Sequence, residues 1–437
     1  MEAPAKKTSE NTALNNAIIA LSRNIQSLRD FVEMIEALLQ QKELQLFQDK
    51  GKHLLPLIAA AKEVMPSAFK DVPVTREQAE KACGGKIKVH IKENTDSKKT
   101  FEVTIPGDDS KGFEDAMKAM TSHHRSYELL YESTLISLLS SVELFFSRIM
   151  HFNFTKFPGL VGGKDKVFSF DELTLFGSVE DARTYLIESR VENLLRDSFE
   201  EWITQTKKMC NLTAGYLEPH WEELCETWQR RNLIIHNGGV VNGIYLAKVK
   251  QRKDKPLKKG DKLRVSPSYL RKRFDLFELN CLLLAFDLWK KLSPKDELRS
   301  NSLMGIGYDR LEAKNWQVAE GLSRFLAGEK NLPEAYQLVG KFNFWQSVKR
   351  QNRWSEIKEE VEQEEIDSKS ARFRLAWYSL TERKDEFFKL LPSVLKSEEI
   401  SSEELMTWPI FEDMRSDERY KKYAAKKTRV PKQITKK

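Results

Sequence analysis

The chain has 437 residues, of which 40% are hydrophobic and 31% are charged, a composition typical of ordered globular proteins rather than disordered chains. No uncharged apolar run is long enough to cross a bilayer, and residues 1–16 contain no apolar signal core, so we expect a cytoplasmic protein without a membrane partner. The formal net charge of +7 permits a polyanionic partner without requiring one, and the length suits two or three domains.

Residues 1–121 are predicted to form a small module of one helix and a β-hairpin. Apolar residues recur every three or four positions over residues 15–47, which is typical of an amphipathic helix, and Gly51 is its expected end. Apolar and polar residues alternate over residues 87–91 and 101–105, which predicts two strands joined by a polar turn. We expect the apolar stripe of the helix to be core; the alternative is a partner-docking or dimer-forming face.

Residues 122–293 are predicted to form a bundle of four helices. The first begins near Ser122 and places one apolar face in the core: Leu135, Leu138, Leu139, Val142, Phe146 and Ile149. The others are expected at residues 179–209, at residues 218–236 with Pro219 at the start, and at residues 266–292. Pro267 favours a helix start directly after Ser266, because the first helical position needs no backbone donor.

Residues 294–425 are predicted to form helical-repeat-like hairpins, which makes the whole chain mainly α. Segments at residues 315–317, 353–355 and 384–386 resemble repeated turns between paired helices, spaced by roughly 34 residues as in tetratricopeptide arrays. Such a platform suits a protein trigger or regulator as a partner. The basic tail, residues 426–437, is expected to be frayed.

The most informative stretch is residues 228–239, with the sequence WQRRNLIIHNGG. Arg231 and His236 lie five positions apart near the end of a predicted helix. On a continuous helix they are offset by about 140°, and a loosened helix end would bring them together. Gly238 and Gly239 suit a helix C-terminus, so His236 is expected in the last turn, where the helix dipole favours the imidazolium.

This pattern resembles the Arg-x4-His signature of the HEPN superfamily, in particular its RiboL-PSP-like members. The resemblance covers residues 122–292. It implies a HEPN-type four-helix bundle, homodimerisation, and a metal-independent endoribonuclease whose composite site forms where two Arg-x4-His helices meet. It also implies a role as a conditional toxin in prokaryotic defence against phage. Some members have a tyrosine two residues after the histidine, where this chain has Gly238; Tyr245 is a candidate replacement.

The residue types support RNA cleavage by transesterification. His236 can accept a proton from a ribose 2′-hydroxyl or return one to the leaving 5′-oxygen. The Arg231 guanidinium can hold the phosphate and offset charge on its oxygens. These groups suffice to form a 2′,3′-cyclic phosphate, so we expect neither metal nor cofactor. Asn232 either orients the phosphate or histidine or is solvated, and Glu143 either reaches the pair from the first helix or is solvated.

Other interpretations remain open. In a purely structural interpretation, Arg231 pairs with Glu226 or Glu223 and His236 only caps its helix. In functional terms, the alternatives are a non-catalytic HEPN scaffold that binds RNA, a nucleotide or a protein, and a repeat-type adaptor. The sequence contains no phosphate-cradling glycine loop or serine elbow, and its four cysteines lack the paired spacing of a metal site.

A dense basic segment, residues 248–264, follows the motif. Such a segment can neutralise the phosphates of RNA and release their counterions. The alternative is a solvated hairpin tip that contacts no RNA. The candidate RNA-binding residues are Lys250, Arg252, Lys253, Lys255, Lys258 and Lys259.

Overall fold

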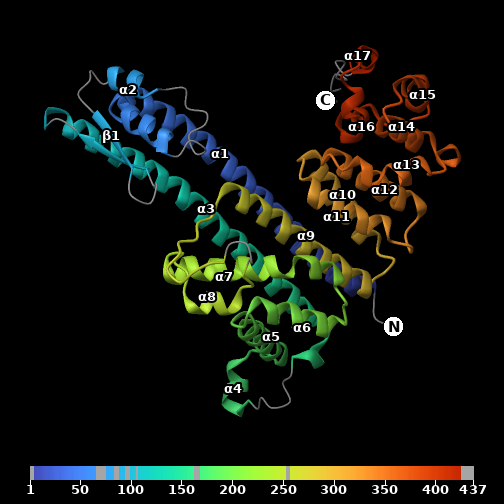
Figure 1. Ribbon diagram of the computed structural model, residues 1–437. Helices are drawn as coiled ribbons and strands as arrows, with labels where there is room; N and C mark the ends of the chain where they lie inside the picture. Colours follow the sequence, from blue (N-terminus) through green and yellow to red (C-terminus); the bar gives the residue numbers. More distant parts are fainter. Residues whose placement is uncertain are drawn as a thin grey trace, which may run out of the picture.

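The computed structural model describes residues 4–64, 75–82, 88–93, 99–104, 107–161, 168–251 and 256–424, and it is mainly helical (Figure 1). Its strands are β1 (Lys88–Glu93) and β2 (Lys99–Thr104), which pair antiparallel with Lys88 opposite Thr104. Ile87, Ile105 and the basic tail lie outside the described residues. The helices are α1 (Pro4–Val64), α2 (Arg76–Ala82), α3 (Gly107–Lys156), α4 (Phe170–Leu175), α5 (Val179–Leu195), α6 (Phe199–Cys210), α7 (Trp221–Asn237), α8 (Gly243–Lys248), α9 (Pro267–Leu292), α10 (Glu297–Glu312), α11 (Trp316–Ala327), α12 (Glu334–Arg350), α13 (Lys358–Glu362), α14 (Ala371–Leu380), α15 (Lys384–Lys396), α16 (Ser402–Thr407) and α17 (Glu418–Ala424).

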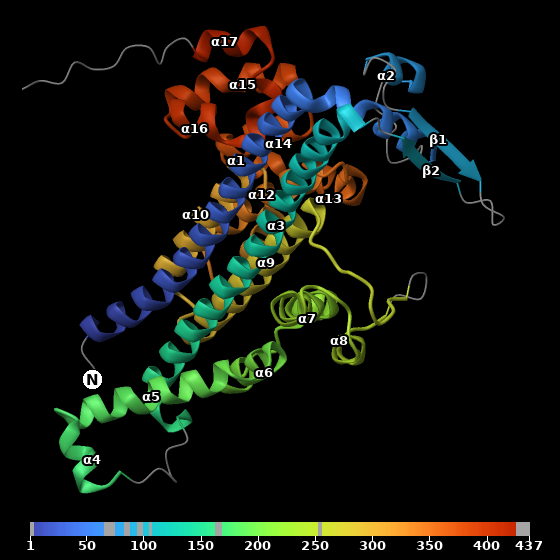
Figure 2. The same ribbon diagram turned by 90° about the vertical axis from the view of Figure 1, so that its left-hand side faces the viewer.

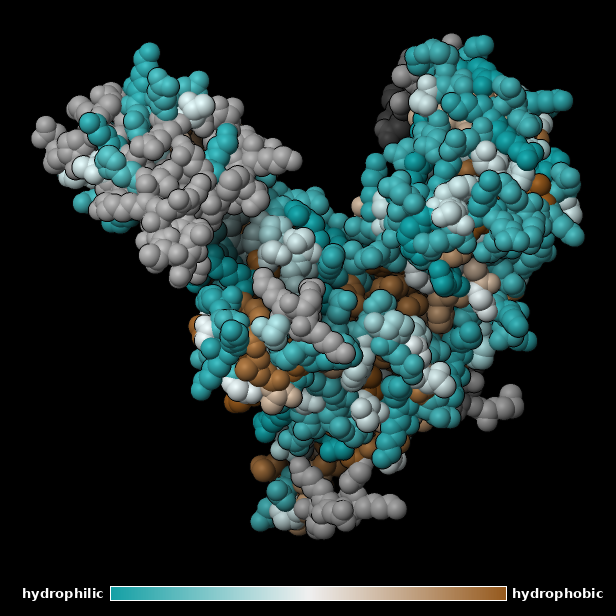
Figure 3. All heavy atoms as spheres, in the orientation of Figure 1, coloured by the Kyte–Doolittle hydropathy of each residue, from teal (hydrophilic) through white to brown (hydrophobic). Residues whose placement is uncertain are grey.

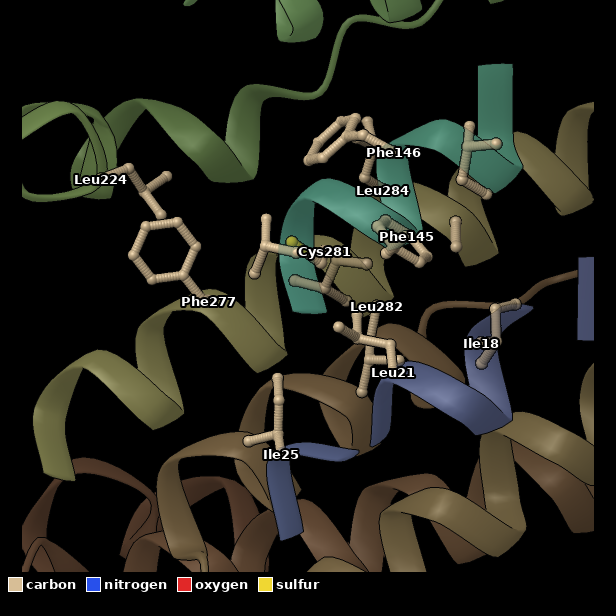
Figure 4. Close-up of a cluster of buried hydrophobic side chains, with 14 of the residues drawn as sticks. Ile18, Leu21, Ile25, Phe145, Phe146, Leu224, Phe277, Cys281, Leu282 and Leu284 are labelled. Atoms are coloured by element: carbon tan, nitrogen blue, oxygen red, sulfur yellow. The ribbon is translucent and has the colours of Figure 1, made fainter. Parts of the chain in front are cut away.

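Three long helices, α1, α3 and α9, lie side by side and form the centre of the molecule (Figures 1 and 2). Their facing sides are apolar: Ile18 and Leu21 of α1, Phe146 of α3, and Phe277 and Leu282 of α9 all belong to one buried cluster (Figure 4). The apolar stripe of the N-terminal helix is therefore mostly core, as its periodicity predicts. Burial of this kind is the main source of stability for such long helices.

The predicted N-terminal module is not separate from the bundle. α1 continues through Gly51 instead of ending there, because Leu54, Ala59 and Ala61 beyond it are buried. α3 begins at Gly107, so the expected boundary at residues 121 and 122 falls inside a helix. The two helices pack along much of their length and share one core with α9.

Within the predicted bundle, two of the helix boundaries differ from the expected ones. The second helix is divided into α5 and α6, because the Ser198 side chain accepts a hydrogen bond from the Glu201 N–H and starts a new helix. The third, α7, begins at Trp221 after a 3-10 turn that contains Pro219. The fourth begins as predicted, with Ser266 as the N-cap and proline directly after it.

The C-terminal region consists of short helices joined by tight turns. Four of these turns contain a non-glycine residue in the left-handed region: Lys314, Asn352, Glu382 and Glu398, with φ of 58°, 60°, 60° and 57°. The first three lie one or two residues before the turns predicted at residues 315–317, 353–355 and 384–386. The core does not divide at the expected boundary of residues 293 and 294, however, because Leu303, Val318 and other residues of α10 and α11 belong to the central cluster. A second cluster begins at Leu338.

Buried charges connect α1, α9 and α10. The Glu278 carboxylate on α9 is fully buried and accepts hydrogen bonds from Arg29 of α1 at 2.9 Å and from Arg310 of α10 at 2.7 Å. Arg310 also donates to the backbone oxygen of Ser22 at 3.0 Å. A buried charge is tolerated only when it is paired and hydrogen-bonded, so these contacts fix how the three helices meet.

α3 is long and apolar enough, by length and composition, to cross a membrane. More than half of its most apolar stretch is buried inside the structure. Its apolar face packs against α1, α5 and α9, which accounts for this composition in a core helix.

Candidate functional site

The motif lies on α7, which is helical as far as Asn237. Gly238 and Gly239 follow with φ of 56° and 79°, a left-handed conformation that ends the helix at little cost only for glycine. His236 is therefore in the last turn, as predicted. The helix end is regular and not loosened, so the offset of about 140° between Arg231 and His236 persists within one chain.

Arg231 is half-buried between α7 and α3, and few of its donors are used. One Nη donates to the Asn232 side-chain oxygen at 3.1 Å, and the other lies 3.9 Å from the Glu143 carboxylate. Its Nε is buried and has no hydrogen-bond partner among the described residues. The structure thus brings Glu143 and Asn232 to Arg231, while the guanidinium, with five N–H donors, keeps capacity for an anion.

The neighbouring Arg230 has a structural role. Its Nε donates to Glu226 at 2.7 Å and its guanidinium stacks on the Tyr269 ring at 4.1 Å. Glu223 is likewise occupied, by Arg273 at 2.5 Å. Neither Glu226 nor Glu223 is paired with Arg231, so the predicted pairing of Arg231 with one of them is wrong. Of the two consecutive arginines, Arg231 is the one with more unused hydrogen-bond donors.

His236 is exposed, and no described residue forms a hydrogen bond or ion pair with its imidazole. Its neighbour Ile235 is 45% exposed, and so is Leu144, next to Glu143 on α3. Ile244 on α8 is 68% exposed. The site is therefore an open surface with apolar residues around it rather than a closed pocket, and such a surface suits a large partner.

Tyr245 does not replace the tyrosine that some HEPN proteins have after the histidine. Its side chain is buried, and its hydroxyl donates to Glu226 at 2.7 Å, as does that of Tyr269. Burial, followed by the nearby Glu226 carboxylate, raises the pKa of the Tyr245 hydroxyl above its ordinary value. Tyr245 is thus a protonated donor within the packing of α7, α8 and α9.

The basic segment is anchored directly to the end of the motif helix. The Leu263 N–H donates to the Gly239 oxygen at 2.8 Å, and the Val241 N–H donates to the Asp261 oxygen at 2.8 Å. The Lys262 ammonium donates to the Gly238 oxygen. Lys258 and Lys259 are exposed in the same turn. Positive charge is therefore held beside His236 by backbone hydrogen bonds.

The other predicted RNA-binding residues are placed differently or lie outside the described chain. Lys250 is exposed and pairs with Glu222 at the opposite end of α7 from His236. Arg252, Lys253 and Lys255 lie outside the described residues. Only Lys258 and Lys259 of the six candidates are thus placed by the structure next to the motif.

We expect Gly239→Ala to destabilise the protein more than Gly238→Ala. A Cβ at position 239 would lie 2.7 Å from the Leu263 backbone oxygen, whereas at position 238 nothing lies within 4 Å. In both variants the new alanine must adopt the left-handed backbone conformation, which lowers stability by about 1–2 kcal/mol. Only Gly239→Ala also displaces the basic segment. Urea unfolding of the two variants measures the difference. Equal losses would show that the segment is not anchored there.

Sequence reasoning missed two features of this site. Lys262 counted only as one of many basic residues, although it contacts the backbone next to His236. The Arg230–Glu226 pair was also missed, although its spacing of four residues is a recognisable signal for a helix-surface ion pair. That signal would have indicated that Arg230, and not Arg231, pairs with Glu226.

Comparisons with protein families, with curated proteins and with solved structures give no match to this chain. Among the described residues, no group of three or more histidines, cysteines or carboxylates is arranged to hold a metal ion. The function therefore has to be inferred from the residues of the site.

Proposed function

We propose that this protein is an endoribonuclease of the HEPN type, in which Arg231 binds the scissile phosphate and His236 transfers protons. The observation that carries the proposal is the contrast between the two arginines of α7. Arg230 donates to Glu226 and to the Arg264 backbone oxygen, whereas Arg231, on the motif, makes one hydrogen bond, a 3.9 Å contact to Glu143 and a 5.9 Å contact with the Trp228 ring. A half-buried arginine with free donors and an exposed histidine on the same helix are the groups that phosphate chemistry needs.

The site is proposed to be composite, with two α7 helices from two copies. Within one chain, Arg231 faces α3 while His236 is offset from it around the helix, so a phosphate held by both needs a second copy or a large displacement. The exposed Ile235 and Leu144 at the site would be covered in such a dimer. We expect the principal dimer contact within residues 122–292.

A direct test is incubation of the full-length chain with total RNA, with His236→Ala as the comparison. Cleavage by the wild-type chain alone supports the proposal. Retained RNA binding with no cleavage by either chain would instead favour the non-catalytic scaffold. A phage-defence toxin would in addition arrest the growth of its host when active, and the C-terminal helices would then carry the trigger.

We expect the basic segment to guide RNA to this site. Replacing Lys253, Lys255, Lys258 and Lys259 with glutamine should weaken RNA binding and flatten its dependence on salt, because each lost phosphate contact lowers the slope by about 0.7 for single strands. Binding measured from low to high salt gives this slope. As a control, Lys314→Gln and Lys358→Gln change exposed lysines far from α7. If the dependence of RNA binding on salt is unchanged in the fourfold variant, the basic segment does not contact RNA.

A further inference from the structure

A short helix, α4, projects from the bundle with its apolar side chains exposed. None of its residues is buried, and Phe170 and Leu175 are 80% and 85% exposed, as is Val179 just beyond it at 84%. The helix is nevertheless well formed, because Ser169 and Glu172 cap its start reciprocally. Figure 3 shows apolar residues among the surface atoms at this end of the molecule. Apolar exposure of this size marks a surface that contacts another molecule.

This projecting segment, residues 168–181, is also strongly acidic. It contains Asp171, Glu172, Glu180 and Asp181 but no lysine or arginine, and Arg183, just beyond it, pairs with Glu180 at 3.3 Å. We call it the acidic arm. Its combination of exposed apolar groups and negative charge predicts a partner surface that is apolar and rimmed by positive charge.

Such a surface exists on the same chain, between the start of α1 and the end of α3. A groove of about 750 Å³ has small residues on its α1 side, Ala13, Ala17 and Ala20. Arg23 and Arg148 line it from the two helices, and no described residue pairs with either guanidinium. No carboxylate lines the groove. We call it the alanine groove.

We propose that the acidic arm of one copy docks into the alanine groove of a second copy, in a reciprocal two-fold contact. Phe170 and Leu175 would cover the alanines, and the arm carboxylates would pair with Arg23 and Arg148. A reciprocal contact requires the arm and the groove to lie at the same end of each copy. The helix α4 and the start of α1, which lines the groove, both lie at the end of the molecule where α1 begins (Figures 1 and 2).

The contact stands independently of RNA cleavage and of the proposed composite site. Arg148 in the groove and Glu143 beside Arg231 lie on the same helix, but five residues apart they are offset by about 140° around its axis. A second copy seated in the groove would therefore meet a different face of α3 from the one that contacts Arg231.

Sedimentation velocity of the full-length chain at micromolar concentration tests the contact. We expect a dimer, and we expect Phe170→Ser with Leu175→Ser, or Arg23→Glu with Arg148→Glu, to raise its dissociation constant at least about tenfold. All four side chains are exposed, so the variants should fold. Met34→Ser with Leu38→Ser, which changes exposed apolar residues elsewhere on α1, is the matched control and should leave the dimer intact.

A charge exchange separates docking from structural damage. Chains with Arg23→Glu and Arg148→Glu should dimerise with chains carrying Asp171→Arg and Glu180→Arg more tightly than either variant dimerises alone, because only the mixture has opposite charges at both contacts. A monomeric wild-type chain, a dimer insensitive to these changes, or no recovery on mixing would overturn the proposal. RNA cleavage measured on the same samples reports separately on the proposed function.

Discussion

Arg231→Ala and His236→Ala should each reduce RNA cleavage by about a hundredfold or more, the usual scale for a general acid–base group or a charge stabiliser. The chain should stay folded in both variants, because His236 is exposed and Arg231 makes one hydrogen bond, a long ion pair and a 5.9 Å contact with the Trp228 ring. Arg231→Lys should not restore activity, since a point charge cannot reproduce the planar guanidinium. Single-turnover cleavage rates, circular dichroism and melting temperature measure these effects.

Matched controls come from the same residue types elsewhere in the chain. His90→Ala in β1 and Arg190→Ala in α5 remove exposed side chains away from the motif and should leave the rate unchanged. Arg230→Ala should behave differently again, with a loss of stability as well as activity, because Arg230 holds Glu226 and Tyr269 in place. Full activity in both Arg231→Ala and His236→Ala would eliminate the proposed chemistry.

Glu278→Ala should lower the free energy of unfolding by about 3–5 kcal/mol, because it leaves Arg29 and Arg310 buried without their shared carboxylate. Their side chains are only 10% and 5% exposed, so water cannot compensate for the lost partner. Urea unfolding followed by tryptophan fluorescence measures the loss.

Glu222→Ala is the matched control for this prediction. Glu222 also forms an ion pair, with Lys250, but both side chains are exposed, and such pairs contribute less than about 1 kcal/mol. The double variant with Glu278→Ala and Arg310→Ala should lose less unfolding free energy than the sum of the losses in the two single variants. The reason is that removing both partners leaves no unpaired charge from this pair in the core. A loss below about 1 kcal/mol for Glu278→Ala would show that the cluster does not hold the helices together.

The apolar periodicity of the sequence was enough to predict the long central helices, whereas the short helices and the individual helices after α9 were not placed. The buried faces of α1 and α3 follow the threes and fours of Ile18, Leu21 and Phe146, and the start of α9 follows from serine and proline at residues 266 and 267. The lengths of α1 and α3 could not be predicted. Gly51 is a local stop signal, and only packing between distant segments overrides it.

The candidate site was predictable in part. The place of His236 followed from the two glycines, and Glu143 was expected near Arg231 as one of two alternatives. The pair of Glu226 with Arg230 could have been predicted from its spacing, but the contacts of Glu226 with Tyr245 and Tyr269 and of Glu223 with Arg273 could not, because those partners come from other helices. The anchoring of the basic segment depends on backbone hydrogen bonds that have no side-chain signature.

The measurement that tests the central claim most directly is the chemistry of the cut RNA. If Arg231 and His236 carry the reaction, cleavage should persist in EDTA, and the 5′ product should end in a 2′,3′-cyclic phosphate. A substrate with a 2′-deoxy sugar at the cut site should be inert, because the attacking hydroxyl is missing. Cleavage that disappears with EDTA, or that proceeds on the 2′-deoxy substrate, would contradict the assignment of Arg231 and His236.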